Sequence, residues 1–235
     1  MKAVLHAKLL LPLSLFLATL ILFEHTNLDL VVQDLFFNFN TGTWLVDSEA
    51  PLLRLIFYSG IKGVIIAVGI VTVICFVLSF KNTRLRKWRQ GLLLCILSLA
   101  LVPLLVAGGK QFTNVYCPYQ IQRYDGVVPY VKLLGSYPET FHPKRRGKCF
   151  PAGHATGGFA FMALYYVFKK RRARIAGLGT GLILGWTMGL YQMFKGAHYL
   201  SHTVVTMLLA WIIICVIHTC VISLGTKKGF GWIAP

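Results

Sequence analysis

Long apolar stretches with almost no charged residues constrain this chain more than any other feature. A helix that crosses a hydrocarbon core of about 30 Å needs about 20 apolar residues, because lipid offers no partner for a backbone N–H or C=O group. Hydrophobic residues make up 56% of the chain and charged residues 13%, which disfavours a water-soluble domain. The sequence predicts one all-α membrane domain with six transmembrane helices. The expected spans are residues 3–23, 55–80, 91–109, 150–168, 175–194 and 201–226.

The distribution of basic residues predicts the orientation of these spans. The chain has 24 Lys and Arg against 7 Asp and Glu, a net charge of +17. A nucleic-acid-binding protein would place such charge among polar residues, so no nucleic-acid partner is expected. The basic loops 81–89 and 169–174 separate apolar blocks, and short loops of this kind stay in the cytoplasm. We therefore expect both termini in the cytoplasm, segments 24–54 and 109–149 outside, and a bacterial inner membrane as the location.

The second outer segment carries a basic cluster and two cysteines. Lys and Arg are disfavoured on the outer side, so their presence there indicates an anionic ligand, with a solvated loop near anionic lipid head groups as the alternative. Cys117 and Cys149 both lie in this segment, and an oxidising compartment permits disulfides. We predict that they are bonded to each other. The basic residues are Lys110, Arg123, Lys132, Lys144, Arg145, Arg146 and Lys148.

Three groups of polar residues fall at the ends of predicted spans, and the predicted topology brings all three to the outer side. Lys110 ends the third span and precedes Cys117-Pro118. The segment 149–154, Cys-Phe-Pro-Ala-Gly-His, begins the fourth span. The segment 192–202, Gln-Met-Phe-Lys-Gly-Ala-His-Tyr-Leu-Ser-His, joins the fifth span to the sixth. The sequence therefore predicts one site shared by the three groups.

These groups resemble the signature of the type-2 phosphatidic acid phosphatase superfamily, which also contains vanadium haloperoxidases. The family has Lys, six residues, then Arg-Pro; Pro-Ser-Gly-His; and Ser-Arg, five residues, His, three residues, Asp. Lys110 and Pro118 stand at the spacing of the first motif, and His198 matches the third. The second motif is matched by Pro151, Gly153 and His154.

The resemblance implies dephosphorylation of a lipid phosphate or diphosphate through a phosphohistidine. It implies that His198 is the nucleophile, that His154 is the general acid, and that Lys110 and the Gly153 backbone N–H bind phosphate. Histidine suits both roles because its ordinary pKa lies near neutrality. No metal and no cofactor are required. The expected partners are a phosphorylated lipid and the surrounding membrane lipids; the sequence leaves the oligomeric state open.

Four functional positions of the family are changed in this chain: Cys117, Ala152, Gln192 and His202 stand where the family has Arg, Ser, Arg and Asp. The chain has no acid after Glu139, so His198 needs another orienting group. His202, a backbone carbonyl, Asp125 and Glu139 are the candidates.

The changed positions also remove two phosphate-binding arginines of the family. We hypothesise that one or more of Arg145, Arg146 and Lys148 replaces the arginine missing at position 117. Lys195 and Gln192, which lie within the third motif, are further expected phosphate-binding residues.

Three other functions remain open from the sequence. Transfer of the phosphoryl group to a second lipid would use the same site. His198 and His202 are four residues apart on a predicted helix, and with His154 they suggest a three-histidine metal site. The third alternative is a protein that binds lipid phosphates without catalysis, because the family Asp is lost.

Overall fold

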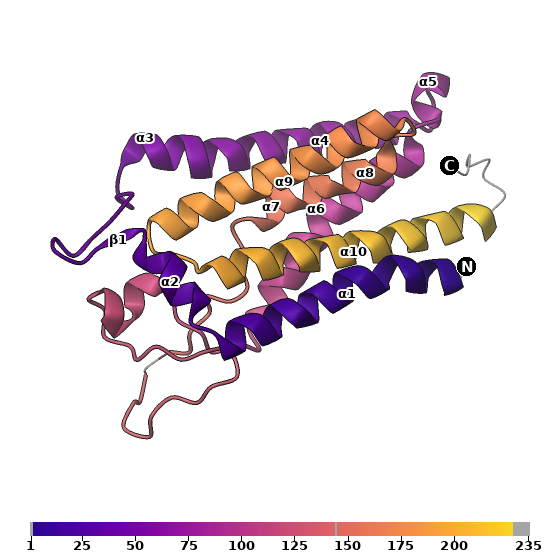
Figure 1. The fold of residues 1–235 in the computed structure, drawn as a ribbon. Helices are drawn as coiled ribbons and strands as arrows, with labels where there is room; N and C mark the ends of the chain where they lie inside the picture. Colours follow the sequence, from indigo (N-terminus) through magenta and orange to yellow (C-terminus); the bar gives the residue numbers. More distant parts are fainter. Residues whose placement is uncertain (1, 144, 228–235) are drawn as a thin grey trace.

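A computed structural model describes residues 2–143 and 145–227 of the chain. The protein is mainly helical, and its long helices run side by side (Figure 1). In the N-terminal half, α1 (Lys2–His25) is followed by α2 (Leu28–Asp34) and a small hairpin, in which β1 (Phe37–Asn38) pairs antiparallel with β2 (Thr43–Trp44). The remaining helices of this half are α3 (Pro51–Arg54), a π-helical turn (Leu55–Gly60), α4 (Ile61–Leu78), α5 (Thr83–Arg86) and α6 (Arg89–Gly109).

The C-terminal half begins with a long irregular segment that contains two short 3-10 turns, Pro118–Gln120 and Gln122–Tyr124. Its helices are α7 (Thr156–Ala160), the 3-10 turn Phe161–Ala163, α8 (Leu164–Val167), α9 (Arg171–Phe194) and α10 (Leu200–Lys227).

Within the described residues, three helices are long and apolar enough to cross a membrane: Pro51–Leu78, Arg89–Gly109 and Leu200–Ser223. Part of α1 and α2 together satisfy the same criterion, but they are bent by 75° at the break between them. The predicted fourth span is only a short apolar helix, Thr156–Val167, and α9 does not qualify by composition. The all-helical membrane class is therefore supported, whereas the count of six spans stays a prediction.

The short helix packs against one face of α9. Gly158 and Gly181 lie at their contact, where an added Cβ would collide with the backbone of Gly185 and of Met162 respectively. Glycine is the residue that permits this close approach. The core around this contact also receives residues of α6 and α10, including Val102 and Ile214. The irregular fourth element is thus surrounded by regular helices rather than by lipid.

The helix bundle has two structurally different ends (Figure 1). The start of α1, the end of α10, α5 and the junction of α8 with α9 all lie at one end, and both basic loops are found there. The hairpin, α2 and the long irregular segment lie at the opposite end. This arrangement agrees with the alternation of the predicted orientation; which end faces the cytoplasm stays a prediction.

An aromatic cluster joins segments 24–54 and 109–149 at the irregular end. Phe37 and Trp44 of the hairpin pack on Tyr124, with ring centroids 5.2 and 5.1 Å away. Arg123 donates two hydrogen bonds to the carboxylate of Asp34, at 2.8 and 2.6 Å. Segment 24–54 thus forms a short helix and a hairpin that pack on the loop between α6 and α7.

Candidate active site

The three motif-bearing segments meet at the irregular end of the bundle. Lys110 caps the C-terminus of α6, His154 immediately precedes α7, and His198 lies in the turn between α9 and α10. Backbone hydrogen bonds connect these segments: the Ala152 N–H donates to the His202 carbonyl at 3.3 Å, and the Tyr119 N–H donates to the Gly196 carbonyl at 2.9 Å. The convergence predicted from the sequence is present in the structure.

The three histidines form a chain of contacts. His154 Nδ1 lies 3.1 Å from His198 Nε2, and His198 Nδ1 lies 3.4 Å from His202 Nδ1. His202 also hydrogen-bonds to the backbone of Cys149. The Cys149 N–H is donated to the Val115 carbonyl, so the Cys149 carbonyl is the group that accepts from His202. The chain runs from a backbone carbonyl through two buried imidazoles to His154.

Burial and positive charge keep the two catalytic candidates neutral. His198 is 2% exposed, and burial together with the neighbouring His202 and His154 holds its pKa well below the usual value. The pKa of His154 is lowered to about 4 by burial first and then by the charges of Lys110, Lys195 and Lys62. Both imidazoles therefore carry a free nitrogen lone pair near neutral pH.

Lys110 and Gly153 lie against each other. A Cβ at position 153 would stand 3.2 Å from both Cε and Nζ of Lys110, so glycine leaves the space through which the lysine reaches this segment. Burial lowers the pKa of Lys110. A half-buried ammonium beside two neutral imidazoles is a suitable partner for a phosphate oxygen.

Gln192 and Lys195 flank His198 in different ways. The Gln192 backbone carbonyl accepts the N–H groups of Ala197 and His198, at 2.8 and 3.3 Å. Its side chain is 1% exposed, and its Oε1 has no hydrogen-bond partner among the described residues. Lys195 Nζ lies 5.1 Å from the ring centroid of Tyr191 and 5.9 Å from that of Tyr58. Gln192 thus fixes the His198 turn through its backbone carbonyl, and Lys195 places a cation on the side of His154.

No contact with the histidines is found for the basic run Arg145, Arg146 and Lys148 among the residues that the structure describes. All three residues are exposed, and the cations whose charges act on His154 and His198 are Lys110, Lys195 and Lys62. The Arg145 carbonyl accepts a hydrogen bond from the Tyr116 hydroxyl. The hypothesis that this run replaces the family arginine stays a prediction without a supporting contact in the described part of the chain.

The predicted disulfide is present, with Cys117 and Cys149 bonded over a separation of 32 residues. Cys149 Sγ lies 3.4 Å from His198 Nδ1 and 3.0 Å from the Ala197 carbonyl oxygen. The disulfide therefore ties the segment after Lys110 to the second motif and contacts the loop that carries His198.

The geometry does not suit the three-histidine metal site. His198 faces His154 with Nε2 and His202 with Nδ1, so its two nitrogens point to different partners, whereas one metal ion takes one nitrogen from each imidazole. Cys117, Cys149 and His198 bring ligand atoms within 4.8 Å of one another. Two of these atoms are bonded in the disulfide, which leaves no thiolate for a metal ion.

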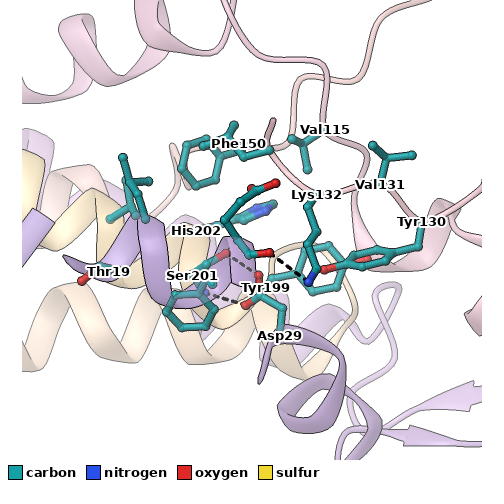
Figure 2. Close-up of a pocket in the computed structure, with 15 residues that line it drawn as sticks. Thr19, Asp29, Val115, Tyr130, Val131, Lys132, Phe150, Tyr199, Ser201 and His202 are labelled. Atoms are coloured by element: carbon teal, nitrogen blue, oxygen red, sulfur yellow. Dashed lines mark hydrogen bonds between the residues drawn. The ribbon is translucent and has the colours of Figure 1, made fainter. Parts of the chain in front are cut away.

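Two residues of α2, neither of them singled out by the sequence analysis, hold the loop that carries His198. Asp29 accepts the Ser201 N–H at 2.8 Å and the Ser201 hydroxyl at 2.5 Å, at the start of α10 (Figure 2). Gln33 Nε2 donates to the Met193 carbonyl at 2.8 Å, near the end of α9. Both side chains are buried, although Asp29 and Gln33 lie 172 and 160 positions from their partners along the chain. No local sequence signal marks such a contact; only the burial of an acid in a short helix reveals it.

We expect Asp29→Asn to lower kcat by about 10- to 100-fold with a small change in KM. The amide loses the charge that both Ser201 donors approach, and a shift of about 1 Å in a reacting group is enough for such a loss. Asp34→Asn on the same helix is the matched control, because Asp34 contacts Arg123 and Tyr124 rather than the loop. Equal kcat values for the two variants, measured on folded protein, would contradict the assignment.

Figure 2 shows a pocket beside His202 that is separate from the predicted site residues Lys110 and His154. Its described lining includes Asp29, Tyr130, Lys132 and His202, and does not include Lys110 or His154. Lys132 crosses the pocket and donates to the Glu24 carbonyl at 3.0 Å.

The two acids proposed to orient His198 do not contact it in the structure. Asp125 lies beside Gly42 of the hairpin, and Glu139 is exposed. Of the proposed orienting groups, His202 is the one that contacts His198, and the Cys149 carbonyl contacts His202 in turn.

Comparison with known proteins agrees with this geometry. A family model described as the PAP2 superfamily matches residues 91–224, more than half of the chain. No curated protein and no solved structure shows a significant match. The matched region runs from α6 to α10, so it contains all three motif-bearing segments and leaves out α1 to α5.

Proposed function

The chain belongs to the PAP2 superfamily, whose members have phosphatase-type activity, and on that basis we propose that it is a membrane phosphohydrolase of the type-2 phosphatidic acid phosphatase kind. It removes phosphate from a lipid phosphate or diphosphate through a phosphohistidine. The observation that carries this proposal is the 3.1 Å contact between His154 Nδ1 and His198 Nε2 beside Lys110. A phosphoryl group that separates these two nitrogens has a nucleophile on one side and a proton donor on the other.

The contacts of His202 support a specific tautomer of the nucleophile. A neutral imidazole carries one N–H, and His202 donates it to the Cys149 carbonyl. The Nδ1 lone pair of His202 then accepts the Nδ1–H of His198. This leaves the lone pair of His198 on Nε2, the nitrogen that faces His154. His202 and a backbone carbonyl thus take over the orienting role of the family Asp.

The reaction follows in two steps. His198 Nε2 forms a bond to phosphorus while the bond from phosphorus to the leaving oxygen breaks, and His154 gives its proton to that oxygen. Water, deprotonated by neutral His154, then attacks the phosphohistidine and releases orthophosphate. Lys110 and the Gly153 N–H stabilise the charge on the phosphoryl oxygens, which is the main demand of phosphoryl transfer.

The proposed location is a bacterial inner membrane, with the site on the non-cytoplasmic face. The basic loops lie at the end of the bundle opposite the histidines, which supports this orientation through the preference of Lys and Arg for the cytoplasm. A site at the end of apolar helices admits a head group while the lipid chain stays in the bilayer.

The decisive test is phosphate release by the purified protein from a panel of lipid phosphates and diphosphates, with and without a chelator. Turnover that persists in chelator is expected, because no step requires a metal ion. Saturable binding without release from any lipid would instead favour the non-catalytic alternative, and loss of activity in chelator would favour a metal enzyme.

The lowered pKa of His154 predicts an acidic pH profile. A general acid must be protonated in the free enzyme, and the pKa of His154 is about 4. We expect kcat/KM to rise about tenfold per unit as the pH falls from about 8 to about 6. Below that pH the gain should be offset, because burial raises the pKa of Asp29 to about 6 and the charge that holds Ser201 is lost. Lys195→Met removes one charge that lowers this pKa, so its profile should shift to higher pH. His154→Ala reports the ionisation of the substrate alone and serves as the control; an unshifted Lys195→Met profile would contradict the assignment.

A further inference from the structure

A second group of cations lies beside His154, outside the motif-bearing segments. Arg54 ends α3, Lys62 is in the first turn of α4, and Lys195 follows α9. The charges of Lys195 and Lys62 both act on His154, and Arg54 acts on Lys195. Neither Arg54 nor Lys62 belongs to the region matched by the family model.

The helix that carries Arg54 and Lys62 presents one face to the site. Arg54, Tyr58 and Lys62 are spaced by four residues along the helical stretch Pro51–Leu78. The π-helical turn Leu55–Gly60 within it has slightly more than four residues per turn, so the three residues still lie on about the same side. The Tyr58 ring is 5.4 Å from the His154 ring, and Lys195 Nζ is 5.9 Å from the Tyr58 ring. Tyr58 is therefore the point at which this face, Lys195 and His154 come together.

The length of this helix places the two cations at the membrane surface. Its 28 residues span about 42 Å, against a hydrocarbon core of about 30 Å. The apolar run from Gly63 to Phe80 has no charged residue, so Lys62 marks its boundary. Arg54 lies about two turns beyond Lys62, outside the hydrocarbon and on the same side as the histidines.

These cations lack a matching set of acids. Burial and the nearby Arg54 both lower the pKa of Lys195, and Glu49 is the acid whose charge opposes them. The salt bridge found within the described residues, Arg123 with Asp34, lies elsewhere. Three cations near a single acid still repel one another, and an anion bound among them removes that cost.

The direction of the reaction identifies the anion. In the proposed mechanism His198 attacks from one side and His154 protonates the oxygen that leaves on the other, so the leaving group lies on the side of Tyr58, Lys195 and Arg54. The alcohol released from a phosphate monoester has no charge to be recognised there. The leaving group of a diphosphate is itself a phosphate, and its negative charge can be recognised by these cations.

We propose that Arg54, Lys62 and Lys195 form a second anion-binding subsite, which holds the inner phosphate of a lipid diphosphate. This inference rests on the proposed function. The bond from His198 Nε2 to the terminal phosphorus forms, the bond from that phosphorus to the bridging oxygen breaks, and the electron pair stays on that oxygen. The products after attack by water are a lipid monophosphate and orthophosphate.

The test compares farnesyl diphosphate with farnesyl monophosphate in the same detergent. For Arg54→Gln and Lys62→Gln we expect kcat/KM to fall about 10- to 100-fold for the diphosphate and less than about threefold for the monophosphate. Arg84→Gln on α5, an exposed cation at the opposite end of the bundle, should change neither value. Equal losses for the two lipids, or no loss, would overturn the subsite.

A binding measurement separates this inference from the proposed function. Methylenediphosphonate and methylphosphonate are not hydrolysed, so calorimetric titration with each reports binding whether or not the protein is an enzyme. We expect the wild-type protein to bind the diphosphonate more tightly than the monophosphonate, and Arg54→Gln to remove most of that preference. Equal affinity of the wild-type protein for both compounds overturns the subsite, even where phosphatase activity is found.

Discussion

Replacing His198 with alanine is expected to lower kcat by about 10⁴-fold or more, the largest effect of any single substitution in this protein. His198 Nε2 is the nitrogen that contacts His154, and its other nitrogen contacts His202. Loss of the nucleophile removes the covalent intermediate, and the remaining cations supply only charge stabilisation. The measurement is phosphate release from the best lipid of the panel.

Covalent trapping distinguishes this role from a structural one. Wild-type protein quenched during turnover of a radiolabelled substrate should retain label that is labile in acid and stable in alkali, as expected for a phosphoramidate. His198→Ala should retain none, and His142→Ala, which removes an exposed histidine, should retain as much as the wild type. Label that persists in His198→Ala would assign the nucleophile to another residue.

His154→Ala is expected to give the second largest loss, about 10²- to 10⁴-fold in kcat for an alkyl phosphate. A general acid matters most where the leaving oxygen is strongly basic. The loss should therefore be much smaller for 4-nitrophenyl phosphate, whose leaving group departs without protonation. The measurement is the ratio of wild-type to variant kcat for both substrates.

A loss of equal size for both substrates would contradict the role of His154 as the acid. The matched control is Tyr58→Phe, which keeps the aromatic contact with His154 and removes only a hydroxyl. We expect this variant to retain the wild-type ratio between the two substrates. The comparison separates the proton donor from its aromatic neighbour.

The positions of the catalytic candidates were predictable because the motifs coincide with span ends. Lys110, His154 and His198 each lie where an apolar block meets a polar segment, and alternate crossing of a membrane brings such positions to the same side. The disulfide was predictable for a related reason, since both cysteines occupy one outer segment. These inferences need only the order of apolar and polar residues along the chain.

The choice among basic residues was not predictable in the same way. The run at 145–148 is adjacent in sequence to the second motif, yet none of its charges acts on the histidines. Lys62 of α4 acts on His154 and Arg54 of α3 acts on Lys195, although both of these residues are also exposed. Nearness in sequence decides little once a loop of more than 40 residues has to fold back on several helices. Packing of Tyr58 against His154 brings the helix that carries Arg54 and Lys62 next to the histidines.

The sequence by itself determined the helical membrane class, the three converging motifs and the disulfide, because hydrophobic length and residue spacing are local properties. Only the tertiary structure decided that His202 contacts His198 and the backbone of Cys149, that Asp29 and Gln33 bind Ser201 and Met193 on either side of the His198 turn, and that the fourth element is a broken helix. These contacts join residues far apart in the chain. Their formation depends on which side chains become buried together, and no local pattern encodes that outcome.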